Sequence, residues 1–144
     1  YMHASYLKVK VLELLLYLGT EKIQNTQVKV PYFAHTQVKK VKEIQKYMVS
    51  NLRQHYTLEQ LSEQFDIPLT SMKACFKGVF GCSIYAYIQS YRMQAATVLL
   101  QNSDCSITEI AMKMGYDNPS KFSEVFKKEY EMTPSEFRKK YIKA

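Results

Sequence analysis

An internal repeat constrains the fold of this chain more than any other feature. The stretch from Leu58 to Phe80, "LEQLSEQFDIPLTSMKACFKGVF", has a counterpart in residues 107–130. The apolar and small positions of the first part match at one constant offset: Leu58 with Ile107, Leu61 with Ile110, Ser62 with Ala111, and Phe65 with Met114. Beyond the turn the offset grows by one residue, as three further matches show: Met72 with Phe122, Phe76 with Phe126, and Lys77 with Lys127. A repeat of this length indicates one supersecondary unit built twice.

Each copy has the pattern of a helix-turn-helix. A short helix carries a small residue, Ser62 or Ala111, which lets a second helix cross close by. A sharp break follows at Asp66 or Gly115, where a left-handed backbone suits glycine and is tolerated by aspartate. The second helix is apolar on one side only, and in DNA-binding versions its free face enters the major groove. Helical hairpins of this kind also occur in proteins that never touch DNA.

The remaining signals predict an all-α fold with short turns. Three stretches fit the capping box, in which a hydroxyl and a Glu or Gln satisfy free amides reciprocally: Thr57 to Gln60, Ser106 to Glu109, and Thr133 to Glu136. The expected helices cover residues 36–52, 57–65, 69–80, 83–102, 106–114, 119–130 and 133–142. Thr36 is expected to cap the first of them.

The joining helix has a length that suits DNA. At about 1.5 Å per residue it would span roughly 28 Å. Recognition helices held about one DNA turn apart, roughly 34 Å, can enter two successive segments of the major groove. The sequence therefore predicts a first helix-turn-helix at residues 57–80 and a second at residues 106–130, with the joining helix between them.

The N-terminal part is expected to be an isolated apolar helix at residues 5–18, followed by a linker at residues 19–35. One face of this helix collects apolar side chains: Leu7, Val11, Leu14, Leu15 and Leu18. Either it packs against the rest of the domain, or it is the last helix of a larger domain upstream. The start at Tyr1 favours the second interpretation. The apolar run is too short for a membrane span, which needs roughly 20 residues.

Composition narrows the function classes. Basic residues outnumber acidic ones 20 to 13, for a net charge of +7, so a polyanion is the default partner: nucleic acid first, an anionic membrane surface second. An otherwise ordinary basic domain is the alternative. Cys75, Cys82 and Cys105 have no C-x-x-C spacing and are interpreted as buried thiols in a reducing cytosol. Because no nucleophile–base pair, phosphate loop or metal spacing occurs, no enzymatic activity, cofactor or metal is expected.

From about Thr57 to Tyr141 the chain resembles the DNA-binding domain of the AraC/XylS family of bacterial transcription regulators. The stretches that carry the resemblance are "TLEQLSEQF", "FKGVFGCSIYAYI", "YRMQAA", "SITEIAMKMGYDNPSKFSEVFKK" and "MTPSEFRKK". The resemblance implies that residues 36–144 form this domain and that residues 1–18 end a truncated ligand-sensing or dimerising domain. It also implies double-stranded promoter DNA as partner, with RNA polymerase and a second copy of the chain as further partners, no membrane, and a place in the cytoplasm.

The resemblance further implies which side chains touch DNA. Base contacts carried over by motif position are Thr70, Ser71, Lys73 and Ala74 in the first unit, and Ser120, Lys121, Ser123 and Glu124 in the second. Lysine suits guanine O6 and N7, Glu124 suits cytosine N4, and a methyl group suits thymine. Lys77 and Lys127, one turn further on, are expected at phosphates, which position the protein without specifying a sequence.

Several residues depart from the family pattern or have another expected role. Pro68 occupies the position of a frequent serine cap, and Glu131 replaces a frequent glycine at the end of the second recognition helix. Arg92 is expected to form a structural ion pair. The tyrosines of the joining helix are expected to pack in the interior: Tyr85, Tyr87 and Tyr91. The alternative function is a protein-interaction or dimerisation module that uses the apolar helix 5–18.

Overall fold

The computed structural model describes residues 33–141, and within this range it contains only helices and no strand. In chain order the helices are α2 (His35–Ser50), α3 (Leu58–Gln64), α4 (Leu69–Phe80), α5 (Ile84–Asn102), α6 (Ile107–Lys113), α7 (Pro119–Tyr130) and α8 (Pro134–Tyr141). The predicted all-α fold is confirmed, and every predicted helix of this range is present with nearly its predicted bounds. The apolar helix 5–18 and most of the linker, residues 19–32, lie outside the described residues.

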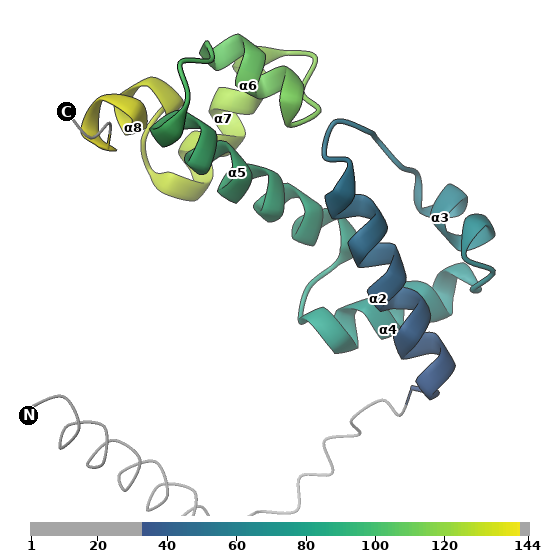
Figure 1. The fold of residues 1–144 in the computed structure, drawn as a ribbon. Helices are drawn as coiled ribbons and strands as arrows, with labels where there is room; N and C mark the ends of the chain where they lie inside the picture. The colour runs from purple at the N-terminus through teal and green to yellow at the C-terminus, as the bar shows by residue number, and fades with distance from the viewer. Residues whose placement is uncertain (1–32, 142–144) are drawn as a thin grey trace, which may run out of the picture. The chain divides into compact units, whose positions relative to one another are not determined.

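Helix α5 connects two groups of helices (Figure 1). Helices α2, α3 and α4 gather at its N-terminal part, and α6, α7 and α8 gather at its C-terminal part. Each group has its own hydrophobic core. The buried residues of the first core are Val41, Ile44, Met48, Leu61, Ile67, Met72, Cys75, Phe76 and Ile84. Those of the second core are Met93, Ala96, Leu100, Ile110, Ala111, Met114, Phe122, Phe126 and Phe137.

The repeat seen in the sequence is a structural repeat. The paired aromatic and apolar positions of α4 and α7 are fully buried, as the repeat predicted: Met72 and Phe122, Phe76 and Phe126. The two turns close with the same backbone hydrogen bond, from Ile67 N–H to the Ser62 carbonyl at 3.0 Å and from Tyr116 N–H to the Ala111 carbonyl at 2.9 Å.

Both turns also need a left-handed residue. The φ angle is 46° at Asp66 and 80° at Gly115, as predicted from the sequence. Helices α4 and α7 end in the same conformation, with φ of 77° at Gly81 and 60° at Glu131. Glu131 is thus the non-glycine left-handed residue that the departure from the family pattern predicted.

All three predicted capping boxes form. The hydroxyl of Thr57 accepts from Gln60 N–H at 3.1 Å, and that of Ser106 accepts from Glu109 N–H at 3.2 Å. Carboxylate or amide oxygens three residues on accept the reciprocal bonds from the cap residues. These bonds satisfy amides that a helix start would otherwise leave without partners.

The expected cap at Thr36 is wrong. Helix α2 begins at His35, so Thr36 lies in its first turn. The free amide of Ala34 is satisfied instead by the Gln37 side chain at 3.2 Å, which allows the helix to start earlier than the hydroxyl position.

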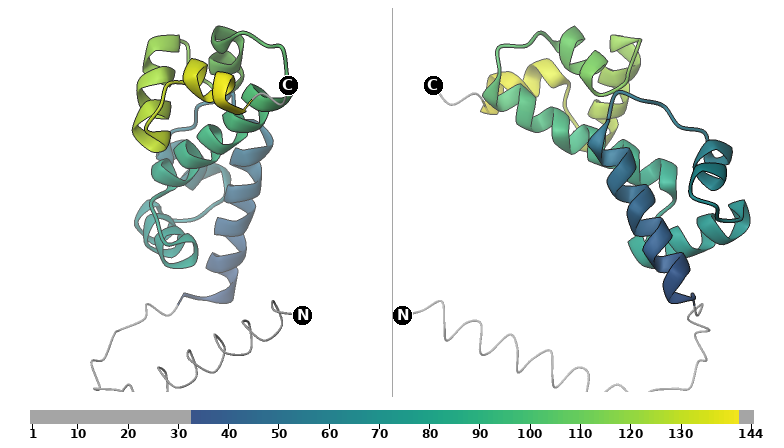
Figure 2. Two further views of the ribbon diagram at one scale, coloured as in Figure 1. Left: turned by 90° about the vertical axis from the view of Figure 1, so that its left-hand side faces the viewer. Right: turned by 45° about the vertical axis from the view of Figure 1, so that its right-hand side comes forward.

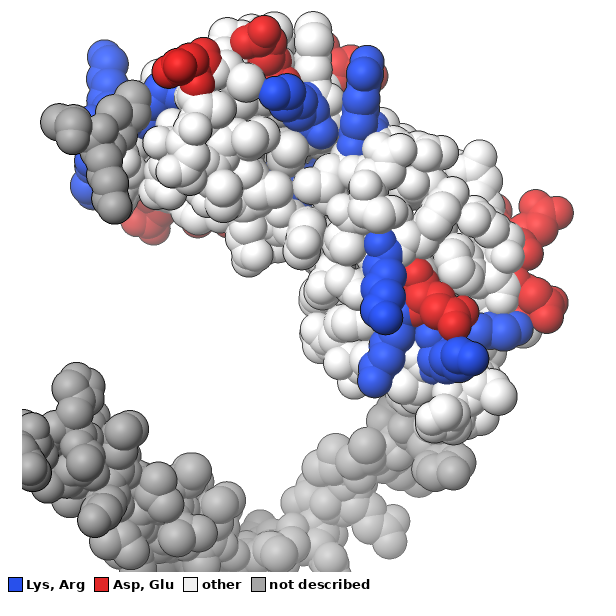
Figure 3. All heavy atoms as spheres, in the orientation of Figure 1, with Lys and Arg blue, Asp and Glu red and all other residues white. Residues whose placement is uncertain are grey.

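The surface carries charges of both signs. On the face drawn in Figure 3, acidic and basic side chains are interspersed, and uncharged surface lies between them. The net positive charge is therefore not collected on this face. No helix among residues 33–141 is long and apolar enough to cross a bilayer.

Candidate nucleic-acid interface

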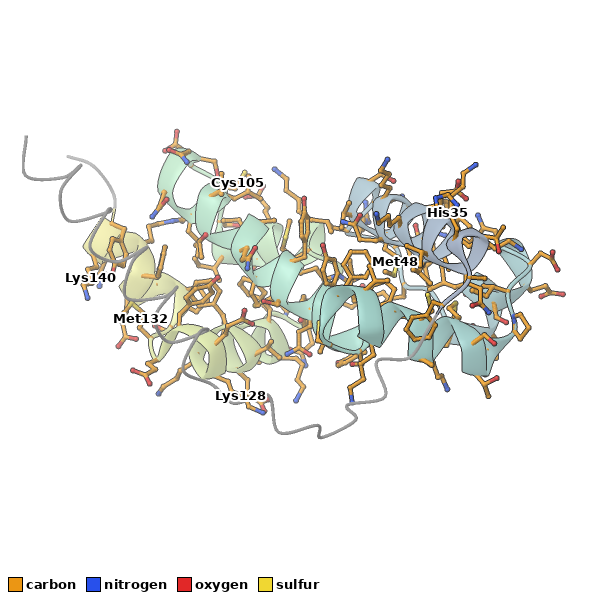
Figure 4. The ribbon with its side chains drawn as sticks, turned by 90° about the horizontal axis from the view of Figure 1, so that it is seen from below. His35, Met48, Cys105, Lys128, Met132 and Lys140 are labelled. Atoms are coloured by element: carbon orange, nitrogen blue, oxygen red, sulfur yellow. The ribbon has the colours of Figure 1, made fainter. Side chains whose placement is uncertain are left out.

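The second helices of the two repeat units, α4 and α7, lie on the same side of α5. In the left view of Figure 2 both lie on the side away from α2. Figure 4, seen along a different direction, also has α4 and α7 along one edge and α2 and α6 along the other. Lys128, labelled in Figure 4, points outward from α7 at this edge. A flat or rod-like partner could therefore meet both helices at once.

Helix α4 presents one polar side outward. Its N-terminal residue follows Pro68, which has no side-chain hydrogen bond to the helix, as the sequence predicted. Because Met72, Cys75 and Phe76 are buried, the 3.6-residue period turns the remaining positions outward. The exposed candidates are Thr70, Lys73, Ala74 and Lys77, and Ser71 is half-buried at the edge of the core.

Helix α7 presents the equivalent side. Its cap is Asn118, whose side chain accepts from Ser120 N–H at 2.9 Å and from Lys121 N–H at 3.4 Å. This cap was not predicted from the sequence, although an asparagine directly before a proline at the first helical position indicates one. The exposed candidates are Ser120, Lys121, Glu124 and Lys127.

Ser123 is less available than the resemblance implies. It is half-buried, and its hydroxyl donates to the Pro119 carbonyl one turn earlier at 2.9 Å. A serine that bonds back to its own helix must break this bond, or accept with its lone pairs, before it contacts a base. Ser123 therefore lies at the margin of the exposed face.

Lys121 and Glu124 form an ion pair on the exposed face of α7. The Lys121 ammonium lies 3.0 Å from a carboxylate oxygen of Glu124, and the two side chains are 60% and 69% exposed. Such exposed pairs stabilise a helix by only about 0.3–0.5 kcal/mol. The pair matters more for the binding of a polyanion, because the carboxylate of Glu124 cancels the positive charge of Lys121 that would attract a phosphate.

The two units therefore differ in charge. Helix α4 carries Lys73 and Lys77 and no acidic residue, whereas α7 carries three lysines and two glutamates. Lys73 and Lys77 form no ion pair with any residue between 33 and 141, so α4 attracts a phosphate more strongly than α7, whose exposed side carries charges of both signs.

Two expectations for α5 are wrong. Tyr85 is 73% exposed and does not pack in the interior, because Ile84 next to it takes the buried position of that turn. Tyr87 does pack against the first core, and Tyr91 is exposed. Arg92 is buried as a structural residue, but it pairs with no carboxylate among the described residues; its Nη2 donates to the Gln54 carbonyl at 2.9 Å.

The cysteines only partly follow expectation. Cys75 is buried, and burial raises the pKa of its thiol. Cys82 and Cys105 are half-buried. Lys113 lies 3.1 Å from the Cys105 sulfur, and this hydrogen bond lowers the pKa of the Cys105 thiol. Within residues 33–141 no group of histidine, cysteine, aspartate or glutamate side chains is arranged to hold a metal ion.

Two tandem helix-turn-helix units, joined by one helix and presenting their second helices on one side, define a double helix-turn-helix protein. A helix-turn-helix domain family model matches residues 61–140, more than half of the chain. Together with the relatives described next, this match shows that the chain belongs to the AraC/XylS family of bacterial transcription regulators.

Curated relatives carry the names of transcription regulators. The HTH-type transcriptional activator RhaR of Mannheimia succiniciproducens is 29% identical over 110 residues, which are 76% of this chain and 40% of the relative. The HTH-type transcriptional regulator ExsA of Pseudomonas aeruginosa is 35% identical over 98 residues, which are 68% of this chain and 35% of that protein. The chain thus corresponds to less than half the length of these relatives.

Solved structures share the fold. The C-terminal domain of AraT, a response regulator from Geobacillus stearothermophilus, matches with a TM-score of 0.69 and 27% identity over 73% of this chain and 88% of that one. The DNA-binding domain of AdpA, solved in complex with a target DNA, matches with a TM-score of 0.67 and 21% identity over 70% of this chain and 91% of that one. At the latter identity the likeness concerns the fold alone.

Proposed function

We propose that this chain binds duplex promoter DNA sequence-specifically as a transcription regulator, with α4 and α7 in two successive segments of the major groove. The observation that carries the proposal is the placement of both helices on one side of α5. Their buried sides anchor them to separate cores, and their polar sides remain free. A helix with a free polar face fits the major groove, and two such helices on one side fit one face of the duplex.

Base reading is assigned to the exposed positions near the start of each helix. In α4 these are Thr70, Lys73 and Ala74, with Ser71 at the margin. In α7 they are Ser120, Lys121 and Glu124, with Ser123 at the margin. Lys73 has no acidic neighbour on its helix and is the clearest candidate for guanine O6 and N7.

Phosphate contacts are assigned to Lys77 and Lys127. Both are exposed one turn beyond the proposed readers, where a recognition helix leaves the groove. A lysine there neutralises one phosphate and releases a condensed counterion, which gives affinity without sequence preference.

The family of the chain supports a proposed domain assignment and cellular setting. We take residues 36–144 as the DNA-binding domain, residues 19–35 as a linker and residues 1–18 as the end of a regulatory domain. We further propose that the chain works in the bacterial cytoplasm, performs no catalysis, and has RNA polymerase and a second copy of the chain as further partners. The alternative of an interaction module is less favoured, because the relatives are named as transcription regulators.

Salt dependence tests the proposal directly. Sites selected from random DNA supply the specific duplex, and a scrambled duplex of the same length is the control. The specific affinity should fall steeply between about 50 mM and 200 mM salt, since phosphate contacts release counterions. A flat response would rule out binding in the groove.

The variant Lys121→Ala distinguishes a contact to a base from a contact to a phosphate. Its affinity for the specific duplex should fall more than its affinity for the scrambled duplex. An equal loss on both would assign Lys121 to the phosphates. Lys42→Ala, on the exposed side of α2, removes the same charge away from α4 and α7 and is the matched control.

A further inference from the structure

The two helix-turn-helix units have separate cores, and α5 passes from one core to the other. Its first turn contributes Ile84 to the first core, and Met93 is its first buried apolar residue in the second. Arg92 lies directly before Met93, at the boundary of the two cores, and is only 8% exposed. One helix alone does not fix the orientation of the two units rigidly, because long helices curve gently rather than stay straight.

A loop of the first unit reaches across this boundary. The segment that joins α2 to α3 belongs to the first unit by sequence, yet Leu52 packs against the second core. A ring nitrogen of His55, in the same loop, donates to the carbonyl of Gly115 in the turn of the second unit. The second helix-turn-helix is therefore held from two sides, by α5 and by this loop.

Gly115 lies directly against the loop that joins α2 to α3. A Cβ atom placed there would lie 2.8 Å from the Leu52 carbonyl oxygen and 3.0 Å from the Arg53 carbonyl oxygen. It would also lie 3.1 Å from Nη2 of Arg92. Backbone oxygens cannot move aside as a flexible side chain can. Gly115 therefore meets two requirements at once, a positive φ and a surface without a side chain.

Arg92 connects the loop to α5. Its Nη2 donates to the Gln54 carbonyl at 2.9 Å, while its Nε is buried and without a partner in the described structure. Burial lowers the pKa of this guanidinium from its usual value. An aliphatic side chain would fill the same position without the cost of desolvating a charge. The directional bond to the loop is thus what arginine contributes here.

We propose that Arg92, Gly115 and the loop of residues 52–55 form an inter-unit latch that holds α4 and α7 in one relative orientation. The inference rests on the proposed function in one respect. If the latch fixes the orientation of α4 and α7, the spacing between the two DNA half-sites also determines which DNA is bound. One inserted base pair moves the second half-site by about 3.4 Å and about a tenth of a turn. A rigid pair of helices cannot follow that shift, whereas a hinged pair can.

The latch can be tested without DNA. Two spin labels on non-natural residues, one at Glu43 on α2 and one at Lys139 on α8, report the distance between the units; both positions are exposed. The labelled protein with Arg92 in place should give one narrow distribution of distances between the labels, and the substitution Arg92→Met should broaden this distribution. An unchanged distribution in Arg92→Met would overturn the proposal.

A pair of glycine variants separates the close approach from backbone strain. Gly81 has φ of 77°, close to the 80° of Gly115, but a Cβ at Gly81 would have no atom within 4 Å. Both Gly81→Ala and Gly115→Ala should lower stability through strain, and only Gly115→Ala should broaden the distance distribution. Equal distributions in the two variants would contradict the latch. If Arg92→Met fails to fold, His55→Phe removes one hydrogen bond of the latch from an exposed loop position and should broaden the distribution as well.

Spacing selectivity then links the latch to DNA. Affinities are measured for the selected site and for versions with one base pair inserted or deleted between the half-sites. For the unmodified chain each change should weaken binding roughly tenfold or more, as one mismatched base pair does. In Arg92→Met this penalty should shrink several-fold. An unchanged penalty refutes the latch and leaves DNA binding intact, whereas a broadened distance distribution without any DNA binding refutes the proposed function and leaves the latch intact.

Discussion

The ammonium of Lys121 and the carboxylate of Glu124 lie 3.0 Å apart on the exposed face of α7. This pair gives Glu124 a role that its position among the proposed base readers did not suggest. In the protein without DNA it neutralises Lys121, and it opposes any phosphate that approaches. Glu124 should therefore reduce binding to sequences that offer it no cytosine N4 donor.

Replacing Glu124 with glutamine should strengthen binding to a scrambled duplex several-fold. The change removes a repelled carboxylate and leaves Lys121 free to neutralise a phosphate, which should make the slope of log affinity against log salt steeper by about one. A filter-binding or fluorescence titration over a salt series measures both quantities. Glu43→Gln changes the net charge equally from α2 and should have little effect. Weaker binding of Glu124→Gln to every duplex would show that the carboxylate helps rather than opposes binding.

Loss of a phosphate-facing lysine should act on all sequences alike. In Lys77→Ala and Lys127→Ala the affinities for specific and scrambled duplexes should fall by similar factors, and the salt slope should become shallower by about one. The same titrations give these values. A loss confined to the specific duplex would move the residue to the base readers.

Relieving the left-handed strain at Glu131 should stabilise the domain. With φ of 60°, Glu131 has a conformation that costs a non-glycine residue about 1 kcal/mol or more, and glycine adopts it freely. Because glycine also increases the entropy of the unfolded chain, we expect Glu131→Gly to raise the free energy of unfolding by about 0.5–1 kcal/mol. Urea denaturation measures the change.

Lys128→Gly provides the opposite control for the strain at Glu131. It places glycine in the last turn of the same helix at an exposed position with helical backbone, where it should lower stability by up to about 1 kcal/mol. A loss of stability in both variants would mean that Glu131 contributes contacts that outweigh its strain.

The capping boxes predict that the two repeats contribute differently to stability at acidic pH. The hydrogen bond from the backbone of Ser106 lowers the pKa of the Glu109 carboxyl, whereas the first repeat has the uncharged Gln60 in this place. A pKa that is lower in the folded state means that the unfolded chain binds the proton first as pH falls. The contribution of the Glu109 carboxylate to the free energy of unfolding is therefore complete above the ordinary carboxyl pKa. It is lost as the pH falls through the lowered pKa of the folded state.

We expect Glu109→Gln to flatten the fall in unfolding free energy between about pH 5 and pH 3. Urea denaturation at a series of pH values gives the two profiles to be compared. Glu136→Gln should act in the same direction, because the hydrogen bond from the backbone of Thr133 lowers the pKa of its carboxyl. Glu59→Gln, an exposed carboxyl without a capping partner, is the control. Identical pH profiles for Glu109→Gln and the unmodified chain would refute this account of the cap.

Much of the fold could be predicted because its signals are local. The periods of apolar residues, the capping boxes and the left-handed turns at Asp66 and Gly115 each act within a few residues, so they can be recognised in the chain itself. The prediction of a cap at Thr36 was wrong because another local group was available. The side chain of Gln37 satisfies the free amide of Ala34, so no Thr36 hydroxyl is needed at the helix start. The assigned roles of the DNA-contacting residues stay predictions, although their placement on the free faces of α4 and α7 agrees with them.

The sequence by itself determined that one helix-turn-helix unit is built twice, which helices form and where they lie to within one or two residues, and which side of α4 and α7 is buried. Only the tertiary structure decided how the units meet. Gln54 and Arg92 are 38 residues apart, and His55 and Gly115 are 60 apart, so their contacts depend on packing that no local period encodes. The outward position of Tyr85 likewise depends on the tertiary structure, because the rotation of α5 is settled only when the surfaces that it packs against are in place.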